Sequence, residues 1–341
     1  MRGSKAVKKA FAAILIFALI LGALSAPLVI CYFRGSTAAE NDISARDHYA
    51  GTIDTFIIGG SQVEYGLDPR IIDPAAGTSS YNMSCVWQNL YGERILARQE
   101  LAQNPVKTVY IGVCLDTLTR TEDNDDGQGE IIMLPRIRGI GNKLDYLLHS
   151  GQLSDLPGLF YFYTHHGMIR LLNILKGQDY TILHFENRGY VPYMLPNQDM
   201  SFDLGGEISV TDYRENGITA DNRENFLALI RECREAGAEV VLFATPLSQV
   251  FLEYTDCWDA YLDEVRALAE EAGVTAPVMD FNLWKGRAEI FDDGTDFYNW
   301  NHLNYSGSQK FSRIFADAIK GAYPEEMFYN SYAEMFAAEG R

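Results

Sequence analysis

The chain lacks the cysteine spacing of a structural metal site or a disulfide framework. It has five cysteines in 341 residues, and no two of them form a C-x-x-C pair. Structural zinc sites usually take their ligands from such pairs. The sequence therefore predicts no metal site. Cys85 and Cys114 stand among apolar residues, where we expect them to pack as small hydrophobic side chains.

Positive charge is also scarce. The chain has 28 Lys and Arg residues against 46 Asp and Glu residues, which gives a formal net charge of −18. Duplex nucleic acid and anionic lipid surfaces attract basic proteins. We therefore expect the body of the protein to bind neither nucleic acid nor an anionic lipid surface. The net charge does not indicate which small substrate would bind.

The N-terminus departs from the rest of the chain. Residues 1–9 hold four basic residues and no acid, and residues 10–33 hold no charged residue. At about 1.5 Å per residue, this apolar run is long enough for a hydrocarbon core of about 30 Å. The basic head predicts a cytoplasmic N-terminus, a transmembrane anchor and a body on the far side. The polar residues 34–50 then read as a linker.

A cleaved signal peptide is the alternative for this N-terminus. The sequence Ala23–Leu24–Ser25 before Ala26 fits a signal-peptidase site. The apolar run continues beyond that site to Phe33, which favours an uncleaved anchor.

The body is organised around the stretch Asp54–Gly66. Phe56, Ile57 and Ile58 predict a buried parallel strand that stops at two glycines. Ser61 follows directly, at the sheet edge where open α/β proteins place their chemistry. The alternative is a serine that only caps a helix, which is a common role for this residue.

A second polar stretch lies 240 residues downstream, around His302. A serine nucleophile needs a base to accept its proton and a third group to orient that base. Asn299 stands three residues before His302, and Asp296 stands six residues before it. Either residue could be the orienting group, and the sequence favours Asn299 by its spacing.

The G-G-S turn at Ser61 and the H-L-N-x-x-G sequence from His302, in this order, resemble the first and last motif blocks of the SGNH/GDSL hydrolase superfamily. The closer likeness is to its membrane-anchored branch, which includes the lipoteichoic-acid D-alanylation and alginate O-acetylation proteins. It covers roughly residues 50–320. The resemblance implies a Ser61 nucleophile, a His302 base and no metal or organic cofactor. It also implies oxyanion donors at the backbone N–H groups of Ser61 and of the Ser84–Cys85 turn.

Two positions depart from the family pattern. Asn299 stands where the family has the acid of its D-x-x-H motif, so Asp296 is the nearest carboxylate. The third block, Val113–Asp116, lacks the asparagine whose amide binds the oxyanion. Gln88 or Asn89 would have to replace that donor, which in other enzymes is worth roughly 3–4 kcal/mol.

Strands and helices alternate as in a doubly wound, flavodoxin-like, five-stranded parallel sheet of SGNH hydrolase type. The predicted strands are 56–58, 78–84, 106–113, 239–245 and 277–281, and the predicted helices are 87–102, 225–236, 258–272 and 306–320. The domain is expected over 51–322, with a C-terminal tail at 323–341. An insertion of about 100 residues, 117–217, interrupts the alternation and includes an acidic loop at 122–129. Its aromatic residues either shape an active site or form a subsidiary core.

Together these features predict an extracytoplasmic, membrane-anchored serine esterase or O-acyltransferase. Its expected substrate is an acylated glycan or other polymer of the cell envelope. A membrane-bound O-acyltransferase is a further expected partner. The alternative is a catalytically silent member that binds a glycan or scaffolds such an acyltransferase.

Overall fold

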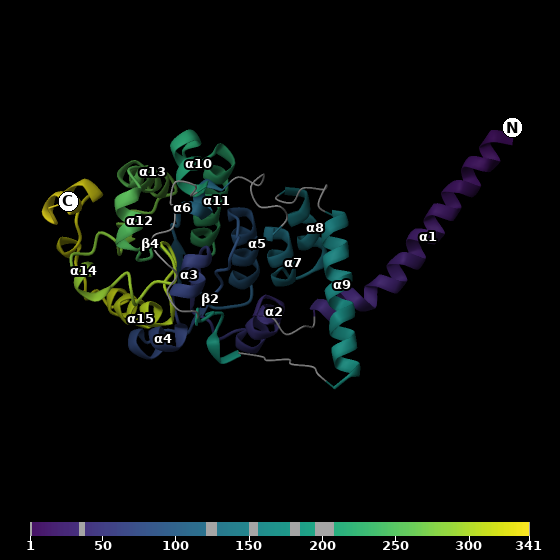
Figure 1. The fold of residues 1–341 in the computed structure, drawn as a ribbon, viewed down its shortest axis with the longest axis horizontal. Coiled ribbons are helices and arrows are strands. Elements are labelled where there is room, and N and C mark those ends of the chain that lie inside the picture. The colour runs from purple at the N-terminus through teal and green to yellow at the C-terminus, as the bar shows by residue number, and fades with distance from the viewer. Residues whose placement is uncertain are drawn as a thin grey trace.

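The computed structural model describes residues 2–33, 38–120, 128–149, 156–177, 185–194 and 208–340. Helix α1 (Arg2–Phe33) projects from the body, which begins at helix α2 (Ala38–Tyr49) (Figure 1). Within α1, Phe11–Tyr32 is long and apolar enough to cross a membrane. This agrees with the predicted anchor in length and composition.

Five parallel strands form the central sheet, as the sequence predicts. They are β1 (Thr55–Ile58), β2 (Ser80–Asn82), β3 (Thr108–Gly112), β4 (Glu239–Ala244) and β5 (Met279–Asp280). Their order is β2-β1-β3-β4-β5. The chain therefore reverses its winding between β1 and β3, and ligands of such sheets bind at this switch point.

Successive side chains of each strand enter different cores. Phe56 and Ile58 of β1 pack in the larger core, while Ile57 packs in the smaller one. This alternation follows from the two-residue period of a strand. The larger core is covered by α5 (Leu90–Leu101), α11 (Ala220–Glu235) and α13 (Trp258–Glu271), and the smaller one by α3 (Ser61–Gly66), α4 (Pro69–Ala76) and α15 (Tyr305–Ile319).

The predicted insertion is mostly helical where the structure describes it. Its elements are α6 (Leu115–Thr119), α7 (Gln128–Arg136), α8 (Ile140–His149), α9 (Leu156–Leu175), the 3₁₀ turn η3 (Phe185–Asn187) and α10 (Ile208–Asn216). Most of the predicted acidic loop 122–129 lies outside the described residues. Smaller elements near the C-terminal half are α12 (Gln249–Tyr254), α14 (Arg287–Ile290), η5 (Glu325–Met327) and α16 (Tyr332–Ala338).

The predicted linker and the predicted C-terminal tail both pack against the body. The predicted linker contains helix α2, whose fully buried Arg46 forms an ion pair with the buried Glu100 of α5. The predicted tail contains α16, where the Tyr332 hydroxyl donates to the Asp280 carboxylate at 2.6 Å. Buried polar contacts between distant segments tie both to the domain, so neither is a loose extension.

Residues Phe185–Met194, which we call the strap, cross the carboxyl edge of the sheet. At one end the Asn82 N–H donates to the Arg188 carbonyl at 2.9 Å, and at the other the Tyr305 N–H donates to the Tyr193 carbonyl at 3.0 Å. Gly189 makes the crossing feasible: its φ is +83°, and a Cβ there would lie 1.8 Å from the Asn82 carbonyl oxygen. The strap brings part of the insertion to the switch point.

Candidate functional site

Ser61 occupies the first turn of α3, directly after the two glycines that end β1. Gly60 is the residue that caps this helix, so Ser61 does not serve as its N-cap. Gly60 also permits a close approach of α6, because a Cβ at that position would lie 2.6 Å from Thr117 Oγ1. The glycine turn therefore leaves the Ser61 hydroxyl at the carboxyl edge of the sheet, where the sequence predicts it.

His302 contacts Ser61 across 241 positions of sequence. Its Nε2 lies 2.7 Å from Ser61 Oγ, within hydrogen-bond range. Burial lowers the pKa of His302 from 6.5 to about 4. The imidazole is therefore neutral near pH 7 and able to accept a proton from the serine.

Asn299 contacts the other nitrogen of the imidazole. Its Oδ1 lies 2.9 Å from His302 Nδ1, and it also accepts the backbone N–H groups of Asn301 at 3.2 Å and His302 at 2.9 Å. Backbone N–H groups only donate, so the amide oxygen, not its NH₂ group, must face the ring. Nδ1 then carries the proton, and Nε2 has a free lone pair toward Ser61.

Asp296 lies away from the imidazole, within the loop that carries it. This fully buried carboxylate pairs with Lys310 at 2.7 Å and accepts from Ser306 Oγ at 3.0 Å. The Asp292 N–H donates to it at 2.9 Å. Of the two orienting groups that the sequence allows, Asn299 is the one in contact with His302.

The backbone donors expected from the Ser84–Cys85 turn are already engaged. The Ser84 N–H donates to Asn82 Oδ1 at 3.1 Å, and the Cys85 N–H donates to Gln88 Oε1 at 2.9 Å. The Cys85 N–H also lies 3.2 Å from the Gly59 carbonyl. In this conformation neither residue presents a free N–H to an oxyanion, which corrects the sequence-based expectation.

Gln88 retains an unused donor. Its side chain is buried, and its Nε2 has no hydrogen-bond partner within the described part of the chain. Asn89, the other residue considered for this role, caps α5 through the Gly92 N–H at 2.8 Å and donates to Tyr146 Oη at 3.2 Å. Of the two, Gln88 is therefore the one whose side-chain amide keeps a donor without a partner among the described residues.

Asp116, which the sequence did not single out, brings a carboxylate close to Gly60, the residue before Ser61. Both of its oxygens lie within 3.9 Å of the position that a Gly60 Cβ would take. Oδ1 is buried without a partner among the described residues, and Oδ2 lies 3.9 Å from Arg120. The Asp116 charge also acts to raise the pKa of His302, against the larger effect of burial.

Glu93 of α5 adds a second acid beside Asp116. It is fully buried, and neither of its oxygens has a partner in the described ranges. Burial, and then the charge of Asp116, raise its pKa well above the usual value for a glutamate. Burial and the field of Asp116 therefore favour the protonated form of Glu93.

Three tyrosines form a chain of ring contacts that begins at the imidazole. The ring of Tyr65 lies 5.6 Å from that of His302, and the ring of Tyr193 lies 4.7 Å from Tyr65. Tyr298 lies 4.1 Å from Tyr193. Burial is the main reason that the pKa of Tyr65 is raised above its usual range. The strap thus contributes Tyr193 to the site, whereas no sequence pattern indicated Tyr65 or Tyr298.

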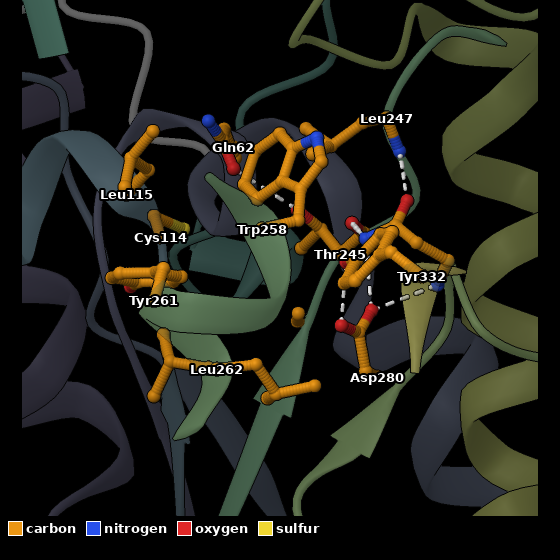
Figure 2. A pocket seen from close by; sticks show the side chains of 13 residues that line it. Gln62, Cys114, Leu115, Thr245, Leu247, Trp258, Tyr261, Leu262, Asp280 and Tyr332 are labelled. Atoms are coloured by element: carbon orange, nitrogen blue, oxygen red, sulfur yellow. Dashed lines mark hydrogen bonds between the residues drawn. The ribbon is translucent and has the colours of Figure 1, made fainter. Parts of the chain in front are cut away.

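A small cavity lies between the sheet and α13 (Figure 2). Gln62 lies at one end, where its Oε1 accepts from Thr245 Oγ1 at 3.3 Å, and Asp280 lies at the other. Trp258 Nε1 and Tyr261 Oη line it without a partner within the described residues. Such polar, enclosed space suits ordered water.

No group of three or more His, Cys, Asp or Glu side chains is arranged to hold a metal ion in the ranges that the structure describes. The scan against protein-family models and the search of curated proteins find no match for this chain. The site must therefore be interpreted from its own geometry.

Proposed function

We propose that the chain is a serine esterase or O-acyltransferase of SGNH type. The observation that carries the proposal is the continuous contact from Ser61 Oγ through His302 to Asn299 Oδ1, with distances of 2.7 and 2.9 Å. A nucleophile, a base and a group that orients the base are the parts that acyl transfer requires. Their position at the switch point of the sheet supports the same interpretation.

In the proposed reaction Ser61 Oγ attacks the carbonyl carbon of an ester while His302 Nε2 accepts the serine proton. The tetrahedral intermediate collapses, the ester C–O bond breaks, and His302 returns the proton to the leaving alkoxide. Attack by water on the acyl-enzyme gives hydrolysis, and attack by a glycan hydroxyl gives transfer. Either second step regenerates Ser61, and neither uses a metal or an organic cofactor.

The oxyanion would be held by the Ser61 N–H and the Gln88 side-chain amide. Ser61 is the first residue of α3, where backbone N–H groups have no partner inside the helix. One oxyanion donor is typically worth about 3–4 kcal/mol of transition-state stabilisation. Two donors and a neutral base would make a slow but specific catalyst.

The proposed substrate is an acyl ester of a cell-envelope polymer, outside the cytoplasmic membrane. The basic N-terminal head and the apolar span of α1 support that topology. Tyrosines and polar side chains around Ser61 are compatible with a glycan. For transfer, a membrane-bound O-acyltransferase is the partner that could supply or receive the acyl group.

Turnover of p-nitrophenyl acetate by the detergent-solubilised full chain tests the proposal. We expect slow hydrolysis that Ser61→Ala abolishes while thermal unfolding stays unchanged. Equal turnover by the two proteins would exclude Ser61 as the nucleophile.

A catalytically silent glycan-binding protein is the second candidate. The Asp116 carboxylate close to Gly60, the residue before Ser61, favours it, because a negative charge there opposes a developing oxyanion. The amide of Asn299 favours it too, since an amide offers no charge to an imidazolium. Glycan binding that survives Ser61→Ala, in a protein without esterase turnover, would identify this candidate.

A further inference from the structure

Helix α9 packs against α1 within the part of α1 that could span a membrane. A Cβ on Gly167 would lie 1.9 Å from the Leu28 carbonyl oxygen, so the two helix backbones touch. The Tyr32 ring lies 5.7 Å from that of Phe162 and 5.0 Å from that of Tyr163. Figure 1 shows α9 crossing the end of α1 nearest the body.

This crossing fixes the depth of α9 relative to the span. Leu28 precedes Tyr32, the last residue of the apolar span, by four positions. At about 1.5 Å per residue, the contact lies about 6 Å inside the end of the span. Helices that lie in the membrane interface bury their apolar face to a depth of about 5–10 Å, at the boundary between headgroups and acyl chains. When α1 crosses a bilayer, the part of α9 around Gly167 must therefore lie at that boundary.

The exposed surfaces of α9 and of α8, which both pack on α7, are mostly apolar. On α8, Leu144 is 52% and Leu148 is 67% exposed, one helical turn apart on the same face. On α9 the most exposed apolar side chain is Leu175, at 74%. The exposed apolar residues of the two helices are Ile140, Leu144, Leu148, Leu156, Phe160, Tyr161, Met168, Ile169, Leu172, Ile174 and Leu175.

The charge of α9 also differs from that of the whole protein. Its twenty residues include no Asp or Glu but do include Arg170, His165 and His166. The chain as a whole carries a net charge of −18. Helix α9 itself therefore adds no negative charge that would oppose contact with anionic lipid.

We propose that α8 and α9 form a second membrane-contacting surface, which lies in the interfacial region of the bilayer that α1 spans. Their exposed apolar side chains enter the acyl-chain boundary, and Arg170 lies near the headgroups. The spanning helix α1 and the interfacial helices α8 and α9 would together hold the body in one orientation relative to the membrane. The inference depends on α1 remaining in the membrane and not on the proposed esterase activity.

Spin-label accessibility in the full chain tests this inference. In a Cys31→Ser background, single labels are placed by Leu148→Cys on α8 and by Leu172→Cys on α9. Val250→Cys on α12 is the control, because it is an apolar, 38% exposed residue on a distant element. The four other cysteines are buried. The proteins are reconstituted in phosphatidylcholine vesicles containing phosphatidylglycerol, and collisions with oxygen and with a water-soluble nickel chelate are measured.

We expect the ratio of oxygen to nickel collisions at residues 148 and 172 to exceed the ratio at residue 250 by at least about tenfold. Oxygen concentrates in lipid, whereas the chelate stays in water. Equal ratios at all three positions would overturn the inference. Shielding of residues 148 and 172 from both reagents would also overturn it, because it would show that protein covers this surface.

Discussion

At the scale of single residues, the unusual feature of the site is an amide where a charged acid would be expected. Asn299 Oδ1 accepts three hydrogen bonds, two of them from backbone N–H groups. These backbone contacts fix the amide orientation and hence the imidazole tautomer. Asn299 can therefore orient His302 correctly, but it cannot stabilise the imidazolium by charge.

Asn299→Asp should raise esterase turnover by about tenfold or more. A carboxylate at this position keeps the contact with Nδ1 and adds the missing charge. In the serine-protease template, the reverse change of Asp to Asn costs roughly 10⁴ in turnover. Steady-state kinetics with p-nitrophenyl acetate measure the gain.

Asp296→Asn is the matched control, because it removes the other nearby carboxylate. Asp296 pairs with Lys310 and not with His302, so this change should lower thermal stability without a specific loss of turnover. If Asp296→Asn abolishes activity in folded protein while Asn299→Asp changes nothing, Asp296 is the functional acid and our assignment is wrong.

We expect kcat/KM to fall at acidic pH with an apparent pKa near 4, and we call this part of the pH profile the acid limb. Burial lowers the pKa of His302 from 6.5 to about 4, so the base stays neutral well below neutral pH. Between these values the unfolded chain binds more protons than the folded one. The contribution of His302 to stability is therefore complete above pH 6.5 and is lost as the pH falls toward 4.

A pH profile of kcat/KM measures the pKa of the free enzyme's base. Asn299→Asp should move the acid limb to higher pH, because a nearby negative charge favours the imidazolium. A wild-type limb at pH 6.5 would contradict the lowered pKa of His302.

The sequence was sufficient to pair Ser61 with His302, because each stands in a short motif. It favoured Asn299 over Asp296 as the orienting group by spacing alone, and the contact with His302 Nδ1 decides between the two. The sequence was not sufficient for Asp116 or Tyr65. These residues reach the site through the packing of α6 and α3, and no local pattern encodes that packing. The engaged N–H groups of Ser84 and Cys85 were unpredictable for the same reason, since their acceptors are set by the fold of the turn.

At the scale of elements, the strap is the segment that completes the site. It carries Tyr193 to within 4.7 Å of Tyr65 and is held at both ends by backbone hydrogen bonds. Gly189 is the tightest point of the crossing. A side chain there must displace the strap or the end of β2.

Gly189→Ala should therefore lower both esterase activity and thermal stability. Gly177→Ala is the matched control, because that glycine also has a positive φ, of +69°, but a Cβ there meets no atom of the described residues within 4 Å. Both variants share the backbone cost of about 1 kcal/mol, and only Gly189→Ala adds a clash. Indistinguishable melting temperatures and activities would mean that the strap does not support the site.

The strands were predictable because parallel strands buried on both faces are short apolar runs, as at Phe56–Ile58. Helix α2 was not, because its residues are mostly polar and its place depends on the buried pair of Arg46 with Glu100. The helices of the insertion were also not predicted from the sequence. Their apolar residues pack against several different elements, so no simple alternation identifies them.

At the scale of the whole molecule, an acidic α/β body is joined to one apolar helix. The helix α1 packs on α9, so the body is placed close to any membrane that α1 crosses. A serine esterase in this position would act on substrates near the membrane surface. The central claim is therefore that Ser61 is a nucleophile activated by His302.

Labelling of the full chain with a fluorophosphonate probe tests this claim most directly, because the probe reacts only with an activated serine. The account predicts one adduct, located at Ser61 by mass spectrometry, and no adduct in Ser61→Ala or His302→Ala proteins that fold normally. An adduct that persists in Ser61→Ala, or no adduct in folded wild-type protein, would contradict it.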